Sequence, residues 1–450
     1  MTTTHCSQLH IALFAFPFSS HPTCLLNVMQ KLSSFLPSNT LFSYFNTSQS
    51  NTLTFSKSSK SNNLKVYDVW DGVKEGNDTP FGHEAIELFI QSTPANFEKS
   101  MKEAEEERGV KLSCIFSDAF LWFSCELAEK IDVPWIALWI SSSYSLSAHL
   151  YTDLIRSNKG TSLNIPGFPS SLRISDVPPE VAENLEGAVP SILYNMALTL
   201  HKAVAVVVNS FEELSPTINK DLKSKLQKVY NVGPLVLESS NNVSLEVDSD
   251  ESGCIEWLDK QNQKSVVYIS FGTITTLSPN ETLAIADALE AKKVPFIWSL
   301  KDNDVKILPK VFLERAEEFG KIVSWAPQLE ILAHSSICVH VSHGGWNSVL
   351  ESISHGVPMI CRPSFADQKL NSRLVESVWE IGLQIEGGSF TKSGTMSALD
   401  IFFNDDKGKV LRQNVVGLKA RALAAVKPEN GSSTQNFKAL ADLVKRHKLA

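Results

Sequence analysis

The stretch from Trp325 to Gln368 constrains the fold more than any other part of the chain. It begins at a strand end and continues with a helix, a second strand over Ile337–Ser342, a Gly-Gly turn, a second helix and a third strand. Apolar residues alternate with others along the second strand, as expected for β-structure. Polar residues cluster where strands end and helices begin, which is where an open α/β sheet binds ligands. The stretch therefore predicts a parallel sheet with a ligand site at one edge.

The heptad SHGGWNS, residues 342–348, is suited to a phosphate. Its glycines permit a tight turn, and Asn347 and Ser348 favour a helix N-terminus. Such a terminus offers unpaired N–H groups and the positive end of the helix dipole. His343 adds a donor, and Glu351, one turn beyond Asn347, is placed to accept from the vicinal hydroxyls of a ribose. An ordinary strand–helix unit fits the heptad equally well, so the heptad alone does not decide.

The whole stretch is more specific, and it resembles the donor-binding signature of plant secondary-product UDP-glycosyltransferases in residues and in length. The family usually has cysteine where this chain has Gly344, and glycine where it has Ala366. The resemblance implies the GT-B architecture, in which two Rossmann-like, doubly wound α/β domains hold the site in the cleft between them. It implies UDP-glucose as co-substrate, with no other cofactor. No aspartate-rich motif stands near the stretch, so we expect no metal.

The resemblance also implies a role for each donor-site residue. Trp325 stacks on uracil with Ala326 and Gln328 beside it, and Glu351 holds the ribose. His343, Asn347 and Ser348 hold the diphosphate, and Trp346, Asp367 and Gln368 hold the sugar. A turn from Ser270 to Thr273, after a strand over Ser265–Ser270, is expected beside the diphosphate, although a plain turn remains the alternative.

Composition bounds the remaining possibilities. A chain of 450 residues predicts two domains, and 43% hydrophobic with 20% charged residues is typical of a globular protein. A net charge of −8 argues against nucleic acid or an anionic membrane as the main partner. The 7 scattered cysteines favour a reducing compartment, and no apolar run is long enough for a membrane span. We therefore expect a cytoplasmic monomer.

Strands and helices alternate along the chain, which predicts doubly wound sheets. The apolar run Ile11–Phe18 predicts the first strand, and single helices are expected over Glu84–Glu106 and Ala119–Ile131. A strand over Val229–Val236 is expected to close the first domain. The pattern divides the chain into an acceptor-binding domain (1–236), a linker (237–253), a donor-binding domain (254–431) and a C-terminal helix (432–450) that folds back across the first domain.

The catalytic base is expected from the first domain. His21 follows the first strand, and a neutral histidine is readily available near neutral pH to take a hydroxyl proton. Asp118 ends another predicted strand, where a carboxylate would fix the imidazole tautomer. Taken alone, His21 fits a structural residue and Asp118 fits a helix cap. The resemblance places the family's catalytic pair at these two positions, and it implies direct displacement with inversion.

Several strings, among them AFPFSSH, DAFLWF and RPSFADQ, look most like the flavonoid 3-O-glucosyltransferase branch, which acts on anthocyanidins and flavonols. The resemblance extends over nearly the whole chain. The aromatic residues near the base suit a flat aromatic ligand. The expected acceptor-binding residues are Phe16, Ser20, His83, Phe120, His149 and Phe365.

Three departures or choices bear on specificity. Relatives usually carry threonine where this chain has Ile140, which offers no hydrogen bond, and Ser141 is the candidate replacement. The residues after His21 also differ from the family pattern. Gln368 favours glucose over galactose within the family. Transfer to another phenolic acceptor, use of another UDP-sugar, and a nucleotide-sugar binder without turnover remain the alternatives.

Overall fold

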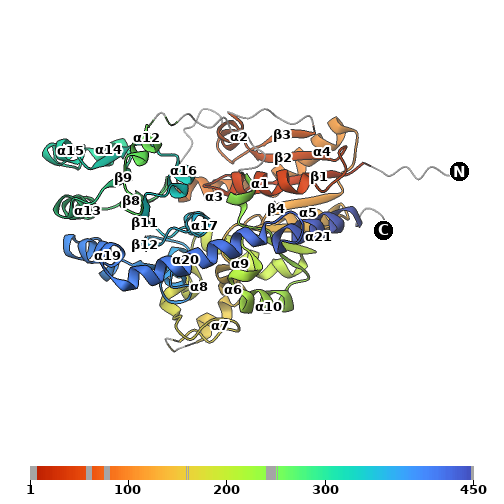
Figure 1. Ribbon diagram of the computed structural model, residues 1–450. Helices are drawn as coiled ribbons and strands as arrows, with labels where there is room; N and C mark the ends of the chain where they lie inside the picture. Colours follow the sequence, from red (N-terminus) through yellow and green to blue (C-terminus); the bar gives the residue numbers. More distant parts are fainter. Residues whose placement is uncertain are drawn as a thin grey trace.

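The computed structural model describes residues 8–56, 63–74, 82–158, 160, 162–239, 250 and 252–446. In this part of the chain, two parallel sheets lie side by side, each flanked by helices (Figure 1). This is the expected architecture of two doubly wound α/β domains. No helix in the described ranges is long and apolar enough to cross a membrane.

The N-terminal domain is built on a seven-stranded sheet in the order β3-β2-β1-β4-β5-β6-β7. All its strand pairs are parallel. The central strands are buried on both faces, which explains why they are almost continuously apolar. The strands are β1 (His10–Phe14), β2 (Leu41–Thr47), β3 (Leu64–Val69), β4 (Cys114–Asp118), β5 (Trp135–Trp139), β6 (Ala205–Val208) and β7 (Val229–Asn231).

The C-terminal domain has a six-stranded parallel sheet in the order β10-β9-β8-β11-β12-β13. β8 and β11 form its centre, so the turns that follow these two strands lie at the same edge. The strands are β8 (Val266–Ser270), β9 (Phe296–Ser299), β10 (Gly320–Val323), β11 (Ile337–Ser342), β12 (Met359–Cys361) and β13 (Gly382–Gln384).

Helices cover both faces of each sheet. Those of the N-terminal domain are α1 (His21–Ser33), α2 (Ser48–Phe55), α3 (His83–Ser92), α4 (Ala95–Arg108), α5 (Ser124–Lys130), α6 (Ser143–Leu150), α7 (Thr152–Ser157), α8 (Pro179–Ala182), α9 (Ala188–Thr199), α10 (Pro216–Lys225) and α11 (Leu235–Ser239). Those that follow are α12 (Cys254–Asp259), α13 (Pro279–Lys292), α14 (Asp302–Val305), α15 (Lys310–Ala316), α16 (Gln328–Ala333), α17 (Trp346–His355), α18 (Gln368–Ser377), α19 (Lys392–Asn404), α20 (Asp406–Ala425) and α21 (Ser432–Arg446).

Several expected element boundaries are wrong. The single helix over Glu84–Glu106 is two helices, α3 and α4, because Pro94 interrupts the backbone hydrogen bonding between them. The helix expected from Ala119 begins only at Ser124, after two turns. The first strand ends at Phe14 and the last at Asn231, because the chain then leaves the sheet to form loops.

The segment after β7 forms α11, which takes up the first residues of the expected linker. Residues 240–249 and 251 of that linker lie outside the described residues. The C-terminal helix α21 lies against the N-terminal domain, where Phe437 and Leu440 join the core that packs on β1 and α1. Asn436 also donates to the Asn231 carbonyl at the end of β7 (2.9 Å). The last helix therefore binds the two domains together (Figure 1).

Candidate active site between the two domains

Two side chains from neighbouring strand ends form a buried pair. β1 and β4 are adjacent and parallel, so the loop after β1 and the end of β4 lie at the same edge of the sheet. His21 begins α1, Asp118 ends β4, and His21 Nδ1 lies 2.6 Å from Asp118 Oδ2. His21 and Asp118 are only 8% and 1% exposed. With Nδ1–H donating to the carboxylate, Nε2 is the acceptor that remains for a hydroxyl proton.

Asp118 also serves its local turn. Its Oδ1 accepts from the backbone N–H of Phe120 at 2.9 Å, while Oδ2 faces His21. The capping role and the orienting role therefore occur together in one carboxylate. Ser19, in the turn that carries the chain from β1 to His21, adopts the left-handed region with φ of +56°. Such strained positions persist where the surrounding structure holds them, often next to functional groups.

The segment predicted to bind phosphate forms the turn between β11 and α17. Gly344 has φ of +75°, and a Cβ there would overlap Ser372 Oγ, which favours glycine over the family's cysteine at this position. Gly345 precedes α17 and provides no side chain to cap its first N–H groups. The turn after β8 meets the same place, because a Cβ on Gly272 would lie 3.2 Å from the His343 ring. The turn from Ser270 to Thr273 therefore lies beside His343, as expected from the sequence.

Burial determines the charge state of the side chains here. It lowers the pKa of His343 to about 4, so the imidazole is neutral near pH 7 and offers one N–H. It raises the pKa of Glu351 to about 7, and a hydrogen bond from Gln328 opposes that rise. Gln328 Nε2 donates to Glu351 Oε2 at 2.5 Å. The Glu351 carboxyl group, predicted to bind the ribose, therefore titrates near neutral pH.

The expected uracil platform is accessible. Trp325 lies between β10 and α16 and is 53% exposed, whereas Ala326 beside it is buried. An exposed indole next to a buried backbone is suited to stacking on a flat base. Trp346 differs, because its Nε1 donates to the Asn209 carbonyl of the N-terminal domain at 2.7 Å. Its indole nitrogen is therefore used at the domain interface. The backbone N–H of Trp346, at the start of α17, remains as the group that could bind the sugar nucleotide.

Two of the three expected sugar-binding residues, Asp367 and Gln368, lie at the start of α18, as its N-cap and its first residue. Gln368 is 3% exposed, and its Oε1 accepts from the backbone N–H groups of Ser364 (2.8 Å) and Phe365 (3.2 Å). Ala366, where the family has glycine, adopts φ of +51°. Burial raises the pKa of Asp367, and hydrogen bonds from Ser141 and Asn371 and the charge of nearby His21 oppose this. Asp367 thus links the donor loop to the buried pair.

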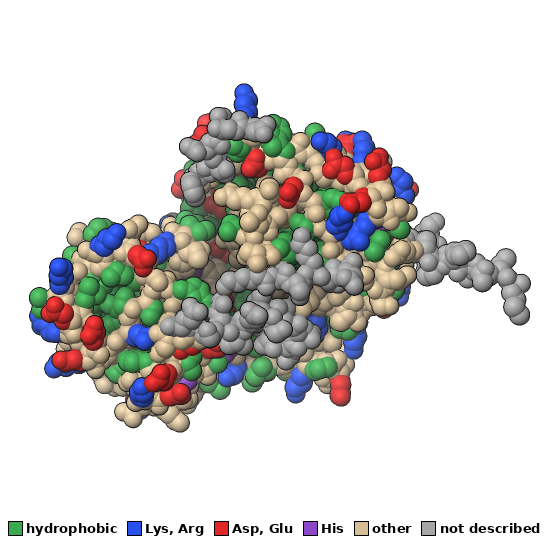
Figure 2. Space-filling view, turned by 90° about the horizontal axis from the view of Figure 1, so that it is seen from above, with side chains coloured by type: hydrophobic (Ala, Val, Ile, Leu, Met, Phe, Trp, Pro, Cys, Tyr) green, Lys and Arg blue, Asp and Glu red, His purple; other side chains and the backbone are tan. Residues whose placement is uncertain are grey.

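Hydrogen bonds cross between the domains on both sides of His21. Asn347 Nδ2 donates to Ser20 Oγ at 3.1 Å, and the Ser141 hydroxyl donates to Asp367 Oδ2. Ser20, expected at the acceptor, contacts the donor segment through this bond, and its contact with the acceptor stays a prediction. Seen from above, the two domains form two lobes with a hollow between them (Figure 2). The predicted base and the predicted donor residues are thus neighbours, as an interdomain site requires.

Aromatic rings surround the base on its own domain. The Phe16 and Phe120 ring centroids lie 5.0 and 4.6 Å from that of His21, and Phe120 continues to Trp139 at 6.0 Å. His149 on α6 packs against Trp139 at 5.5 Å, and burial lowers its pKa to about 3, so it is neutral. These rings form one continuous apolar wall beside His21.

The other expected acceptor residues are less tightly placed. Phe365 is 45% exposed on the donor-side loop. His83 is the first residue of α3, and its side chain lies outside the described residues. Within the described ranges, no group of three or more His, Cys, Asp or Glu side chains is arranged to hold a metal ion.

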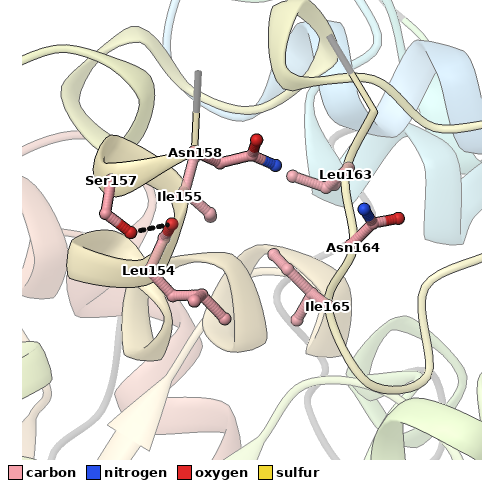
Figure 3. Close-up of a pocket in the computed structure, with 7 residues that line it drawn as sticks. All are labelled: Leu154, Ile155, Ser157, Asn158, Leu163, Asn164 and Ile165. Atoms are coloured by element: carbon pink, nitrogen blue, oxygen red, sulfur yellow. Dashed lines mark hydrogen bonds between the residues drawn. The ribbon is translucent and has the colours of Figure 1, made fainter. Parts of the chain in front are cut away.

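A separate hollow lies between α7 and the segment 163–165 (Figure 3). Its lining residues are Leu154, Ile155, Ser157, Asn158, Leu163, Asn164 and Ile165. None of these side chains carries a charge, and Ser157 Oγ is occupied by the Leu154 carbonyl (2.8 Å). This hollow has no group suited to a nucleotide or to acid–base chemistry, so the interdomain site is the candidate active site.

Known proteins share this arrangement. Residues 243–421 match the family described as UDP-glucoronosyl and UDP-glucosyl transferase. The anthocyanidin 3-O-glucosyltransferase of Solanum melongena is 68% identical over 430 residues, which cover 95% of this chain and 97% of the relative. The flavonol 3-O-glucosyltransferase F3GT2 of Actinidia chinensis var. chinensis is 48% identical over 455 residues, with 98% of each chain covered.

The chain belongs to the UDP-glycosyltransferase family. Within the family it falls in the anthocyanidin and flavonol 3-O-glucosyltransferase branch. A crystal structure of a UDP-glucose:anthocyanidin 3-O-glucosyltransferase in complex with UDP matches with a TM-score of 0.91 and 38% identity. That match covers 98% of this chain and 99% of the solved one. The GT-B fold expected from the sequence is confirmed.

Sequence reasoning missed several residues that support this glycosyltransferase site. Asn209 receives the Trp346 indole, and Arg362 pairs with Glu281 through Nε–Oε1 (2.8 Å) while its Nη1 donates to Ser364 Oγ (2.6 Å). This pair holds the beginning of the sugar loop. Asn209 and Glu281 lie far in sequence from Trp346 and Arg362, so no local spacing could reveal these two contacts.

Ser141 generates a testable prediction for this glycosyltransferase. Ser141→Ala removes a donor from the buried Asp367 carboxylate, and a hydrogen bond to a charged group contributes enough that kcat/KM for the UDP-sugar should fall roughly tenfold. The dissociation constant for UDP, which lacks the sugar, should stay unchanged. Ser141→Thr keeps the hydroxyl and serves as the control. An equal loss of UDP affinity would contradict a contact specific to the sugar end.

Proposed function

We propose that this protein transfers glucose from UDP-glucose to the 3-hydroxyl of a flavonoid, either a flavonol or an anthocyanidin, with inversion. The observation that carries the proposal is the 2.6 Å contact between His21 Nδ1 and Asp118 Oδ2 beside the donor residues. The pair leaves Nε2 as the ring nitrogen available to accept a proton, and the aromatic wall next to it suits a flat acceptor. The overall likeness to anthocyanidin and flavonol 3-O-glucosyltransferases supports the choice of acceptor and sugar.

The reaction needs one proton acceptor and one stabilised leaving group. His21 Nε2 takes the proton of the acceptor hydroxyl, and Asp118 stabilises the imidazolium that forms. The acceptor oxygen forms a bond to the anomeric carbon from the face opposite UDP. The bond between that carbon and the diphosphate oxygen breaks, and its electron pair leaves with UDP. The N-terminus of α17, with His343, Asn347 and Ser348, stabilises the charge on the leaving diphosphate.

The remaining donor contacts follow from the site. Trp325 stacks on uracil beside Ala326 and Gln328, and Glu351 accepts from the ribose hydroxyls. Asp367 and Gln368 hold the glucose hydroxyls, and Ser141 assists Asp367 where relatives use threonine at the position of Ile140. We place the reaction in the cytoplasm, because the six described cysteines are unpaired, buried thiols, as is common in a reducing compartment.

Product formation with a small panel tests the function. UDP-glucose and UDP-galactose are each offered with a flavonol, an anthocyanidin, a flavanone without a 3-hydroxyl, and a simple phenol. We expect glucosylation confined to the acceptors that carry the 3-hydroxyl, with UDP-glucose preferred. Transfer only to the flavanone or the phenol would overturn the 3-O assignment. A preference for UDP-galactose would overturn the sugar, and UDP-glucose binding without any transfer would favour a binding protein.

The role of His21 is tested separately. His21→Ala should lower kcat by roughly 10²- to 10⁴-fold, because the proton acceptor is lost. Its dissociation constant for UDP-glucose should stay within about threefold of the wild type, since the donor contacts lie on the other domain. Asn27→Ala, partly exposed farther along the same helix, is the matched control and should retain full activity. Near-normal turnover by His21→Ala would show that another group is the base.

A further inference from the structure

Tyr268, at the centre of β8, is connected to the nucleoside end of the site although it does not belong to it. It is 1% exposed and pairs in register with His340 of β11. The two rings stack, with centroids 5.1 Å apart and an interplanar angle of 23°. His340 is in turn held by a hydrogen bond between its Nδ1 and Ser352 Oγ of α17 (2.8 Å). The phenol ring is therefore fixed in the middle of the sheet.

The Tyr268 hydroxyl begins a chain of hydrogen bonds. It donates to Gln328 Oε1 at 2.9 Å, and Gln328 Nε2 donates to Glu351 Oε2 at 2.5 Å. An amide has one accepting and one donating side. With the phenol on the oxygen, the NH₂ group faces the carboxylate. The reverse orientation would set two oxygen acceptors against each other. By donating to the amide oxygen, the hydroxyl stabilises the orientation in which the NH₂ group faces the carboxylate.

We propose that Tyr268 is a positioning residue for ribose recognition, because through Gln328 it orients the Glu351 carboxylate and keeps it ionised for the donor. This inference rests on the proposed role of Glu351 in binding UDP-glucose. Tyr268 itself does not touch the donor in this account. The hydroxyl oxygen is the only heavy atom that distinguishes Tyr268 from phenylalanine, and this oxygen makes the bond to the Gln328 amide.

The surroundings of Glu351 make its ionisation sensitive to a single hydrogen bond. Tyr268 on β8 interacts electrostatically with Glu351, and His355 on the same helix bonds the Glu351 backbone carbonyl (2.8 Å). His340 on β11 and Lys419 on α20 bond neighbouring groups, Ser352 and the His355 carbonyl. Burial lowers the pKa of His340 to about 3 and raises that of Tyr268, so both are neutral near pH 7. Lys419 donates to the His355 carbonyl (3.3 Å) rather than to the carboxylate. The Gln328 amide is thus the group that opposes the effect of burial on Glu351.

The sign of the pH effect follows from these contacts. Burial holds the pKa of Glu351 at about 7, so the carboxyl group gains a proton as the pH falls through that value. The Glu351 carboxylate must lose this proton to accept hydrogen bonds from the ribose hydroxyls. The affinity for UDP-glucose therefore weakens toward low pH. Without the Tyr268 hydroxyl, the amide can rotate away, and the inflection should move to higher pH.

The test measures the dissociation constant of UDP-glucose by calorimetry, without acceptor, from pH 5.5 to 8.5. We expect Tyr268→Phe to weaken binding about three- to tenfold at pH 7 and to raise the inflection by at least about half a pH unit. Glu351→Gln should remove the pH dependence, and adding Tyr268→Phe to it should change nothing further. Gln328→Met breaks the same chain of hydrogen bonds at a residue outside the sheet core, and it should cause the same upward shift. It replaces Tyr268→Phe in the test if that variant folds poorly.

Tyr44→Phe is the matched control. Tyr44 is equally buried in β2 of the other domain, and its hydroxyl accepts from Asn46 Nδ2 at 3.3 Å. This variant should leave the inflection unchanged. An unmoved inflection in Tyr268→Phe, or the same shift in Tyr44→Phe, would overturn the inference. Failure of the wild type to bind UDP-glucose at all would instead contradict the proposed function.

Discussion

The proposed function depends first on the hydrogen bond between His21 and Asp118. It exists because β1 and β4 are neighbours in a parallel sheet, which brings two residues far apart in sequence to the same edge. Burial of both side chains excludes water and fixes the imidazole with Nε2 directed away from the carboxylate. The aromatic rings around the imidazole then restrict what can approach it. In the proposed function, the same strand ends thus carry the base and the apolar surface that receives the acceptor.

The second requirement is that the donor be held against this base, and the domain interface provides it. Asn347 meets Ser20, one residue before His21, and Ser141 meets Asp367. The Trp346 indole and the C-terminal helix α21 add further contacts between the two halves. Two of the bonds that cross the interface thus lie beside His21, the proposed base. The contacts that pack the two domains together thus also position the predicted donor residues next to His21. The last helix adds to this packing because it lies against the first domain.

Much of this could be predicted from the sequence, because the informative features are local. The donor stretch carries its own strand–turn–helix pattern, and both buried sheets have continuous apolar strands. The helix boundaries at Pro94 and Ser124 were harder to predict, because the helical spacing of apolar residues continues through segments that form turns. The partners of Tyr268, Trp346 and Ser141 could not be found, because they depend on register and domain packing. Tyr268 alternates within a core strand like any apolar residue, and only its contact with Gln328 distinguishes it.

The most direct test of the central account is the anomeric configuration of the product, read by NMR from the coupling of the anomeric proton. UDP-glucose carries the α-anomer, so a single displacement with His21 as base predicts a β-glucoside at the 3-hydroxyl. An α-glucoside would require two displacements or a different nucleophile, and it would contradict the assignment of His21 and Asp118 as a base and its orienting carboxylate.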